Sequence, residues 1–256
     1  MPTTATRLDR ERAFHDRAFS EQTRAEVRRF YSVTGALRAW YEAELTRRAP
    51  GAEALEYGCG PGSAAYLLAD RGAVVTGIDL SPVAIDLARR EGERRWLENR
   101  LDFQVMDAEH LDFADDSFDV VCGSGIIHHL DLERAYSEIA RVLHPRGAAV
   151  FIEPMGHNPL INAYRNRTPQ LRTVDEHPLR MADLKLAKRW FGSVETRFFT
   201  LTSLAAVPLR ERSIFGGLVR ALDRVDAGLF RVLPPLRRQA WMVGMVLSDP
   251  LPGGDA

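Results

Sequence analysis

The 256-residue chain has a formal net charge of −1, is 45% hydrophobic and 27% charged, and has the composition of an ordinary globular protein. A charge this close to zero gives no reason to expect a nucleic acid as partner, and no run approaches the ~20 apolar residues of a membrane span. No apolar N-terminal run suggests a secretory signal, and the two cysteines do not suggest a disulfide framework. We therefore expect a cytoplasmic protein with a small-molecule substrate.

The N-terminal segment, residues 7–48, is predicted to be helical because apolar side chains recur at helical spacing among arginines and glutamates. Gly35 is where the segment could divide, and Ala49-Pro50-Gly51 ends it. We assign residues 1–50 to a helical lid and residues 51–256 to the main domain.

From residue 52 onward, short apolar runs alternate with helical segments. Strands are expected at 54–57, 73–79, 101–106, 118–124 and 148–153, with helices near 62–71, from Ser81-Pro82 onward, and at 131–144. Ser81 is a predicted N-cap and Pro82 a first helical residue. This alternation predicts right-handed βαβ units and a doubly wound α/β fold with a mostly parallel sheet.

The second half of the chain interrupts this alternation. Residues 154–180 contain four prolines and several arginines and histidines, a helix is expected at 181–191, and strands at 194–201 and 241–247. Between these strands, residues 202–238 place apolar side chains at helical spacing with arginines alongside. That insertion could cover an apolar substrate, contact a membrane surface peripherally, form a homodimer face, or pack onto its own domain.

The strongest local signal is Glu56-Tyr-Gly58-Cys-Gly60-Pro-Gly62, between a predicted strand and a predicted helix. Glycines let the backbone turn sharply and approach a ligand, and the helix N-terminus offers N–H donors. A dinucleotide-binding loop would have its third glycine at position 63, where this chain has Ser63. The spacing therefore argues against NAD without excluding it.

Two acidic residues strengthen the prediction of a cofactor site. Asp79 ends the second predicted strand, where a carboxylate could accept hydrogen bonds from both ribose hydroxyls. Asp107 follows the third strand, where it could receive an adenine amino group. Acids also commonly begin turns and helices after strands, so the ordered set of loop and two acids is more specific than either acid alone.

These segments resemble the class I S-adenosylmethionine-dependent methyltransferases, with a type 11-like core, over residues 52–153. The resemblance lies in Leu55-Glu-Tyr-Gly-Cys-Gly-Pro-Gly62, Gly77-Ile-Asp-Leu-Ser-Pro82, Gln104-Val-Met-Asp-Ala108, Asp116-Ser-Phe-Asp-Val-Val121 and the helix and turn of residues 138–147. It implies a Rossmann-like sheet of seven strands, the last antiparallel, with helices on both faces. The main domain, 51–256, would then be the methyltransferase domain, with S-adenosyl-L-methionine as cofactor.

The resemblance also implies roles for single residues. Three glycines would line the methionine end with Glu56 beneath them, and Asp79 with Leu80 would hold the ribose. Asp107 and Ala108 would flank adenine. Two residues after the fourth strand would border the cofactor. The glycines are Gly58, Gly60 and Gly62, and the bordering residues are Gly123 and Ser124.

Candidate catalytic residues follow the fourth and fifth strands. Methyl transfer from a sulfonium requires alignment of the acceptor and sometimes removal of its proton. Glu153 and His157 form the preferred pair, because both follow a strand at the edge where open α/β sheets bind ligands. His128 is a third candidate, although a buried histidine more often serves a structural role.

Acceptor contacts are expected from the regions outside the cofactor core. His15 and Tyr31 could contribute from the lid, and Arg165 and Arg172 could bind a phosphate or carboxylate of the acceptor. No metal is expected, because the histidines after strands four and five have no helix-fixed ligand spacing. We expect a prenyl, polyketide or lipid-like acceptor with an anionic end, ahead of a small phenolic or hydroxylated natural product.

Two other functions remain open from the sequence. One is a nucleotide-dependent oxidoreductase or epimerase on a similar sheet, against which the position of Ser63 argues. The other is a non-catalytic module that binds the cofactor and serves a partner subunit. The glycine loop with both acids predicts binding, but it does not by itself predict turnover.

Overall fold

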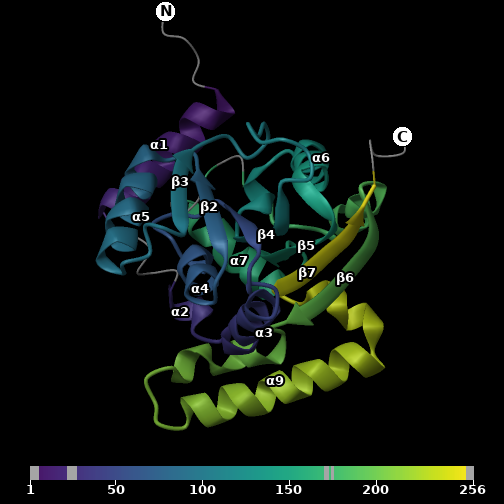
Figure 1. Ribbon diagram of the computed structural model, residues 1–256. Coiled ribbons are helices and arrows are strands. Elements are labelled where there is room, and N and C mark those ends of the chain that lie inside the picture. The colour runs from purple at the N-terminus through teal and green to yellow at the C-terminus, as the bar shows by residue number, and fades with distance from the viewer. Residues whose placement is uncertain (1–5, 22–27, 170–172, 174–175, 252–256) are drawn as a thin grey trace, which may run out of the picture.

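A single seven-stranded sheet forms the centre of the computed structural model, which describes residues 6–21, 28–169, 173 and 176–251 (Figure 1). Its spatial order is β3-β2-β1-β4-β5-β7-β6. The strands are β1 (Glu53–Tyr57), β2 (Val74–Asp79), β3 (Leu101–Val105), β4 (Phe118–Ser124), β5 (Leu143–Pro154), β6 (Phe191–Phe199) and β7 (Met242–Pro250).

Strands β1 to β5 pair in parallel, whereas β7 runs antiparallel to both β5 and β6. The predicted doubly wound sheet with an antiparallel last strand is therefore confirmed. The chain order reverses direction at β1, which has β2 on one side and β4 on the other. In open α/β sheets, ligands bind at the carboxyl edge beside such a switch point.

Helices cover both faces of the sheet. They are α1 (Arg7–Glu21), α2 (Arg28–Tyr31), α3 (Gly35–Thr46), α4 (Ala64–Asp70), α5 (Pro82–Arg94), α6 (Leu132–Val142), α7 (Pro159–Arg167), α8 (Met181–Leu186) and α9 (Phe215–Val232). Single 3₁₀ turns or short 3₁₀ helices are η2 (Ile127–His129), η4 (Ala187–Arg189), η5 (Thr202–Leu209) and η6 (Pro234–Gln239). Ser81 caps α5 by accepting a hydrogen bond from Ala84 N, as predicted.

Alternate side chains of the strands belong to two separate apolar clusters, one on each face of the sheet. In β5, Val150 and Ile152 join the cluster with α3, α4 and α5, whereas Ala149 and Phe151 join the cluster with α6 and α8. This follows from the two-residue period of a strand, which sends successive side chains to opposite faces. Because both faces are covered, the central strands are mostly apolar, with Glu56 in β1 and Glu153 in β5 as buried exceptions.

Two predicted helix ends differ from the structure. The helix expected at 131–144 ends at Val142, and Leu143 already pairs with Phe118 of β4. The helix expected at 181–191 ends at Leu186, and Phe191 begins β6 after one 3₁₀ turn. In both places a buried apolar side chain fits the helical period and the sheet equally well, and strand pairing decides its place.

The regions outside the sheet lie apart from one another. Figure 1 shows α1 beside α5 on one side of the molecule and α9 along its lower edge. Helix α9 packs mainly against η5, η6 and β6, and it buries Val219 and Phe230. Four apolar side chains in and next to α9 remain exposed, at Ile214, Val225, Val232 and Leu233. Among the described residues, no helix has the length and apolar character that crossing a bilayer requires.

Candidate cofactor and active site

The glycine loop turns between β1 and α4 in a conformation that suits glycine alone. Gly58, Gly60 and Gly62 all have positive φ, at 57°, 54° and 83°. A Cβ at Gly58 would lie 2.8 Å from the Ile126 side chain, and one at Gly62 would lie 2.4 Å from the Tyr66 ring. The loop therefore brings bare backbone to the edge of the sheet, where a ligand can approach it closely.

Glu56 lies beneath this loop and fixes its far end. The carboxylate is 1% exposed, and it accepts hydrogen bonds from the Ser63 hydroxyl (2.6 Å), Ala64 N (3.0 Å) and Ala65 N (2.8 Å). Burial raises the pKa of Glu56, and the hydrogen bonds from Ser63 and Ala64 oppose that shift. Glu56 thus satisfies the first N–H groups of α4 and holds the loop against the helix.

Asp79 ties the loop to the end of β2. Its Oδ2 accepts a hydrogen bond from Gly60 N at 2.9 Å, and its Oδ1 accepts one from Ser81 N at 2.9 Å. Each carboxylate oxygen keeps a second lone pair, and Asp79 lines the cavity beside Leu80. The residue can therefore receive two hydroxyl groups while it stays fixed by backbone donors.

Asp107 follows β3 within a turn that also faces the cavity. Its Oδ1 accepts a hydrogen bond from Glu109 N at 2.9 Å, and its Oδ2 lies 3.1 Å from His110 Nδ1. Met106 and Ala108 line the same cavity. The predicted adenine end is thus formed by one apolar side chain, one small residue and one carboxylate.

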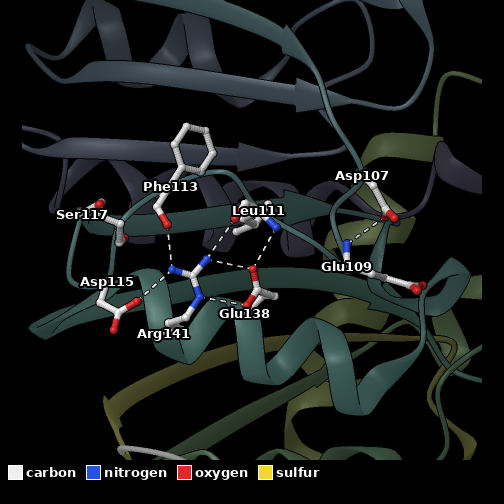
Figure 2. Close-up of polar contacts among 9 residues, drawn as sticks. Asp107, Glu109, Leu111, Phe113, Asp115, Ser117, Glu138 and Arg141 are labelled. Atoms are coloured by element: carbon white, nitrogen blue, oxygen red, sulfur yellow. Dashed lines mark hydrogen bonds and ion pairs between the residues drawn. The ribbon is translucent and has the colours of Figure 1, made fainter.

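A partly buried network of hydrogen bonds and ion pairs holds the segment that follows the Asp107 turn against α6 (Figure 2). Arg141 donates to Phe113 O at 2.7 Å and to Leu111 O at 3.1 Å, and Glu138 accepts from Leu111 N at 2.8 Å. The hydrogen bond from Arg141, aided by Leu111 N, holds the pKa of Glu138 below its usual value. Neither Glu138 nor Arg141 was a predicted site residue, and both act by fixing the position of the turn.

These elements enclose a cavity of about 320 Å³ at the carboxyl edge of the sheet, the size class of small-molecule sites. Its wall contains the three loop glycines, Asp79, Leu80, Asp107, Ala108 and Ser124. Helix α1 supplies the opposite wall with Arg7, Leu8, Glu11 and His15. Eight of the ten predicted cofactor residues, all but Glu56 and Gly123, therefore meet the predicted lid residue His15 at one cavity.

Charged contacts attach α1 over this cavity. Arg7 donates to His129 O at 2.6 Å and forms an ion pair with Glu109, whose side chain is 3% exposed. Near the other end of the helix, Asp16 accepts a hydrogen bond from the Ser81 hydroxyl at the start of α5. Arg7, Glu109 and Asp16 were not predicted as site residues, because their contacts join segments far apart in the chain.

Glu11, His15 and His129 form a polar cluster on the cavity wall. Glu11 Oε2 lies 3.4 Å from His15 Nε2 and 3.3 Å from His129 Nδ1. Burial raises the pKa of the Glu11 carboxyl, but its contacts with His129 and His15 outweigh burial and hold the pKa below the usual range. One sequence signal was available, since Glu11 and His15 are four residues apart in a predicted helix.

Glu153 lies at the end of β5, as predicted, but its carboxylate points into the protein. It is 0% exposed, and Oε1 accepts hydrogen bonds from Ile126 N and Ile127 N, both at 2.9 Å. Its Oε2 lies 2.6 Å from His128 Nδ1, which donates because a carboxylate can only accept. Burial lowers the pKa of His128, and Glu153 opposes that shift. Glu153 thus orients the turn between β4 and α6.

Residues of the 154–180 region reach this turn from outside. His128 Nε2 lies 3.7 Å from Glu176 Oε1, which Arg165 binds at 2.8 Å. His177 N donates to His128 O at 3.0 Å. Arg165 is therefore paired with a carboxylate near the site, where the sequence analysis expected it to bind the acceptor.

The other predicted residues lie away from the cavity wall. His157 accepts a hydrogen bond from Met181 N at the start of α8, and Tyr31 packs against Trp241 with ring centroids 5.3 Å apart. Gly123 packs in the core, where a Cβ would lie 2.7 Å from both Ile126 and Phe151. Arg172 falls outside the described residues.

The structure does not bring the predicted pair Glu153 and His157 together, and the 202–238 insertion packs onto its own domain, one of the alternatives that its pattern left open. Glu153 and His157 have no hydrogen-bond partner in common among the described residues. No described residue of 154–180 or 202–238 lines the cavity, because α9 turns its buried face to η5, η6 and β6 instead. The 154–180 segment reaches the site indirectly, through the contact of Glu176 with His128.

Comparison with known proteins agrees with this site. A family model described as a methyltransferase domain matches residues 55–151. A demethylmenaquinone methyltransferase from Chlorobaculum parvum is 30% identical over 196 residues, which cover 68% of this chain and 77% of that protein. Methyltransferase GfsG from Streptomyces halstedii is 40% identical over 99 residues, which span 38% of this chain and only 36% of the relative's length.

Solved structures of similar fold also include methyltransferases. The Haemonchus contortus phosphoethanolamine N-methyltransferase 2, solved with S-adenosylhomocysteine, matches with a TM-score of 0.67 and 20% identity, over 98% of this chain and 62% of that one. The chain belongs to the class I S-adenosylmethionine-dependent methyltransferases. S-adenosylmethionine is the cofactor of that family, and the residues fit it: bare glycine backbone for the methionine end, Asp79 for two hydroxyls and Asp107 for an amino group.

Proposed function

We propose that the chain transfers the methyl group of S-adenosylmethionine to carbon or oxygen of a small amphiphilic or anionic acceptor of the prenyl, polyketide or lipid-like type. The observation that carries this proposal is the composition of the cavity wall outside the glycine loop and its two acids. There, Leu8, Ile126 and Leu130 provide apolar surface, while Arg7 and His129 provide polar groups. An acceptor with an apolar body and a polar or anionic end matches that mixed wall.

The names of relatives support the apolar part of this acceptor. The Chlorobaculum parvum relative is named for demethylmenaquinone, which is a prenylated quinone. Because the chain spans only 36% of the length of GfsG, that relative supports the class of reaction and not a particular acceptor.

In this proposal α1 is the lid. The cofactor bound against the glycine loop would be covered by the face of α1 that carries Leu8, Glu11 and His15. The charged contacts of Arg7 and Asp16 would hold that face closed. Exclusion of water and alignment of the acceptor are what a displacement at a sulfonium methyl requires.

Glu153 and His128 act in this proposal as positioning residues. Their 2.6 Å contact and the two backbone hydrogen bonds to Glu153 fix the turn that carries Ile126 and His129 to the cavity wall. His157 accepts a hydrogen bond from the first residue of α8, away from the cavity, and its substitution therefore serves as a control for Glu153→Gln. Tyr31 and Arg165 would support the lid and the 154–180 region from behind the wall.

Binding and turnover test the proposal separately. Calorimetric titration should show one S-adenosylhomocysteine per chain and no NAD. NAD binding without S-adenosylhomocysteine binding would instead indicate an oxidoreductase or epimerase. Methyl transfer to a panel of prenylated quinones, polyketides and acidic lipids should identify an acceptor, and cofactor binding with no transfer to any of them would favour a non-catalytic partner subunit.

Single-turnover methyl transfer then tests the positioning residues. Glu153→Gln should lower the rate by roughly 10–100-fold with little change in cofactor affinity, because a misplaced turn costs alignment. His157→Ala should transfer at a near-normal rate, since His157 touches α8 and not the cavity. A general base normally contributes about 10²–10⁴-fold, so a loss of that size in His157→Ala would restore His157 to the reaction.

A further inference from the structure

Unsatisfied polar atoms gather at one point of the cavity wall. Four buried side-chain polar atoms of Glu11, His129 and Thr173 make no well-aligned hydrogen bond among the described residues, although Glu11 Oε2 lies 3.3–3.4 Å from both imidazoles. These four are both Glu11 carboxylate oxygens, His129 Nδ1 and Thr173 Oγ1. Buried polar groups are nearly always hydrogen-bonded, so a concentration of exceptions at a cavity indicates a missing water or ion.

The side chains involved have the chemistry of a metal site. Glu11 is 4% exposed, and its carboxylate faces one nitrogen of His15 and one of His129. The three ligand atoms lie within 4.8 Å of one another. Two imidazoles and a carboxylate are ligands that suit zinc, iron and other divalent transition metals. Glu11 and His15 also share one helix face at a spacing of four residues, which holds them in a fixed relation.

The distances fit a tetrahedral ion. Bonds of about 2.0–2.1 Å to nitrogen and oxygen give a tetrahedron an edge of about 3.3–3.4 Å. Glu11 Oε2 lies 3.4 Å from His15 Nε2 and 3.3 Å from His129 Nδ1. Both contacts are longer than the usual hydrogen bond of about 2.7–3.2 Å between such atoms. The spacing is therefore that of ligands around an ion.

A neighbouring group of His128, His129 and Glu176 is a weaker candidate. His128 Nδ1 is already bound to Glu153 at 2.6 Å, and Arg165 occupies Glu176 at 2.8 Å. A cation there would compete with the Arg165 guanidinium. Among the described residues that line the cavity near Glu11, the one arginine is Arg7, and it is paired with Glu109.

We propose that Glu11, His15 and His129 bind a divalent transition-metal ion of the Zn²⁺ type, with its fourth position open to the cofactor cavity. Three protein ligands and one open position are the pattern of catalytic zinc sites, in which the metal binds and polarises an oxygen. The ion would bind a hydroxyl, phenolate or carboxylate oxygen of the acceptor. That role rests on the proposed function, whereas the metal site itself does not.

Cobalt provides a direct test, because tetrahedral Co²⁺ absorbs strongly in the visible range. The full chain, freed of metal with a chelator, should bind one equivalent of Co²⁺ with a tetrahedral spectrum, and Zn²⁺ should displace it. Glu11→Gln and His15→Ala should each weaken Co²⁺ binding more than ~10-fold, since even loss of an outer-shell partner costs about 10–100-fold. His144→Ala removes an exposed histidine and should bind Co²⁺ as the parent does.

The outcomes separate this inference from the proposed function. S-adenosylhomocysteine binding is measured on the same samples, and thermal unfolding shows whether each variant is folded. A parent chain that binds S-adenosylhomocysteine but gives no tetrahedral Co²⁺ spectrum would overturn the metal site and leave the methyltransferase proposal intact. Equal Co²⁺ affinity in folded Glu11→Gln and His144→Ala would also overturn it. A chain that binds Co²⁺ but no S-adenosylhomocysteine would count against the proposed function alone.

Discussion

Helices α1 and α9 both lie outside the sheet, and both were expected to cover the acceptor, but they are attached by different chemistry. Helix α1 is held by side-chain contacts at its ends, between Arg7 and Glu109 and between Asp16 and Ser81. Helix α9 is held by apolar burial of Val219 and by a buried carboxylate within it. One helix faces the cavity, and the other completes the core.

The carboxylate of α9 is Asp226, which is 2% exposed. It accepts five hydrogen bonds from three consecutive residues at the start of η5. These donors are Leu201 N, Thr202 N, Thr202 Oγ1, Ser203 N and Ser203 Oγ. A buried charge that satisfies so many donors fixes a permanent structure, whereas the few charged contacts of α1 suit a segment that must release a ligand.

The largest effect on stability is expected when the attachment of α9 to η5 through Asp226 is broken. Asp226→Ala should lower the free energy of unfolding by about 3 kcal/mol or more, because buried backbone and hydroxyl donors lose their acceptor. Urea unfolding at neutral pH measures the loss, and S-adenosylhomocysteine affinity of the folded fraction should change little. A folded variant of parental stability would mean that apolar packing alone holds α9.

At the cofactor edge of the sheet, a substitution should change ligand affinity more than stability. Asp79→Ala should weaken S-adenosylhomocysteine binding by about 2–3 kcal/mol, the range for charged hydrogen bonds left unmade. Its stability should fall less than that of Asp226→Ala, because Asp79 is partly exposed and lies at a strand end. Calorimetry and urea unfolding give the two values, and unchanged cofactor affinity in a folded variant would remove Asp79 from the site.

The cofactor edge could be predicted from the sequence because its determinants are local. Gly58, Gly60 and Gly62 have the positive φ values that only glycine adopts readily, and Asp79 follows directly from the end of its strand. The alternation of helices and strands predicted a mostly parallel sheet, and the resemblance to the methyltransferase family implied its antiparallel last strand. The helix ends near Val142 and Leu186 were missed because local periodicity does not show which apolar residue pairs in the sheet.

The acceptor side could be predicted only in part. The pattern of α9 showed a buried face, but amphipathicity does not say which neighbour covers that face. Glu153 was placed at the right strand end, yet the free amides of Ile126 and Ile127 draw its carboxylate inward. Glu11 was not considered, because its partner His129 is brought to it only by the folding of the sheet.

The attachment of α1 should show a smaller effect, expressed in ligand binding. Arg7→Met removes the ion pair with Glu109 and the hydrogen bond to His129 O, and it should weaken S-adenosylhomocysteine binding by about 1–2 kcal/mol. The same helix offers Arg12→Met as an exposed control, which should bind as the parent does. Equal losses in both variants would show that helix charge matters and not the contact with Glu109.

The smallest effect is expected for a variant of α9, Asp223→Asn, which should raise the free energy of unfolding. Burial, with the nearby Asp226 carboxylate, raises the pKa of Asp223 to about 6, although the Ser203 hydroxyl opposes the shift. A carboxyl whose folded pKa is raised stabilises the fold fully below its unfolded pKa, and that stabilisation is lost as pH rises through the folded pKa. Asp223→Asn stays neutral, so its advantage over the parent should grow between about pH 4 and pH 6 and then level off.

Because Asp223 is partly exposed, solvent screening limits the gain to about 0.5–1 kcal/mol at neutral pH. Urea unfolding of the parent and of Asp223→Asn at several pH values across that window measures it, with Asp86→Asn of α5 as an exposed control. A difference that is the same at every pH would show that the pKa of Asp223 is not raised in the folded protein. A pH-dependent gain would show that the charge of Asp223 destabilises the α9 attachment at neutral pH, whereas the charge of Arg7 on α1 is paired with Glu109.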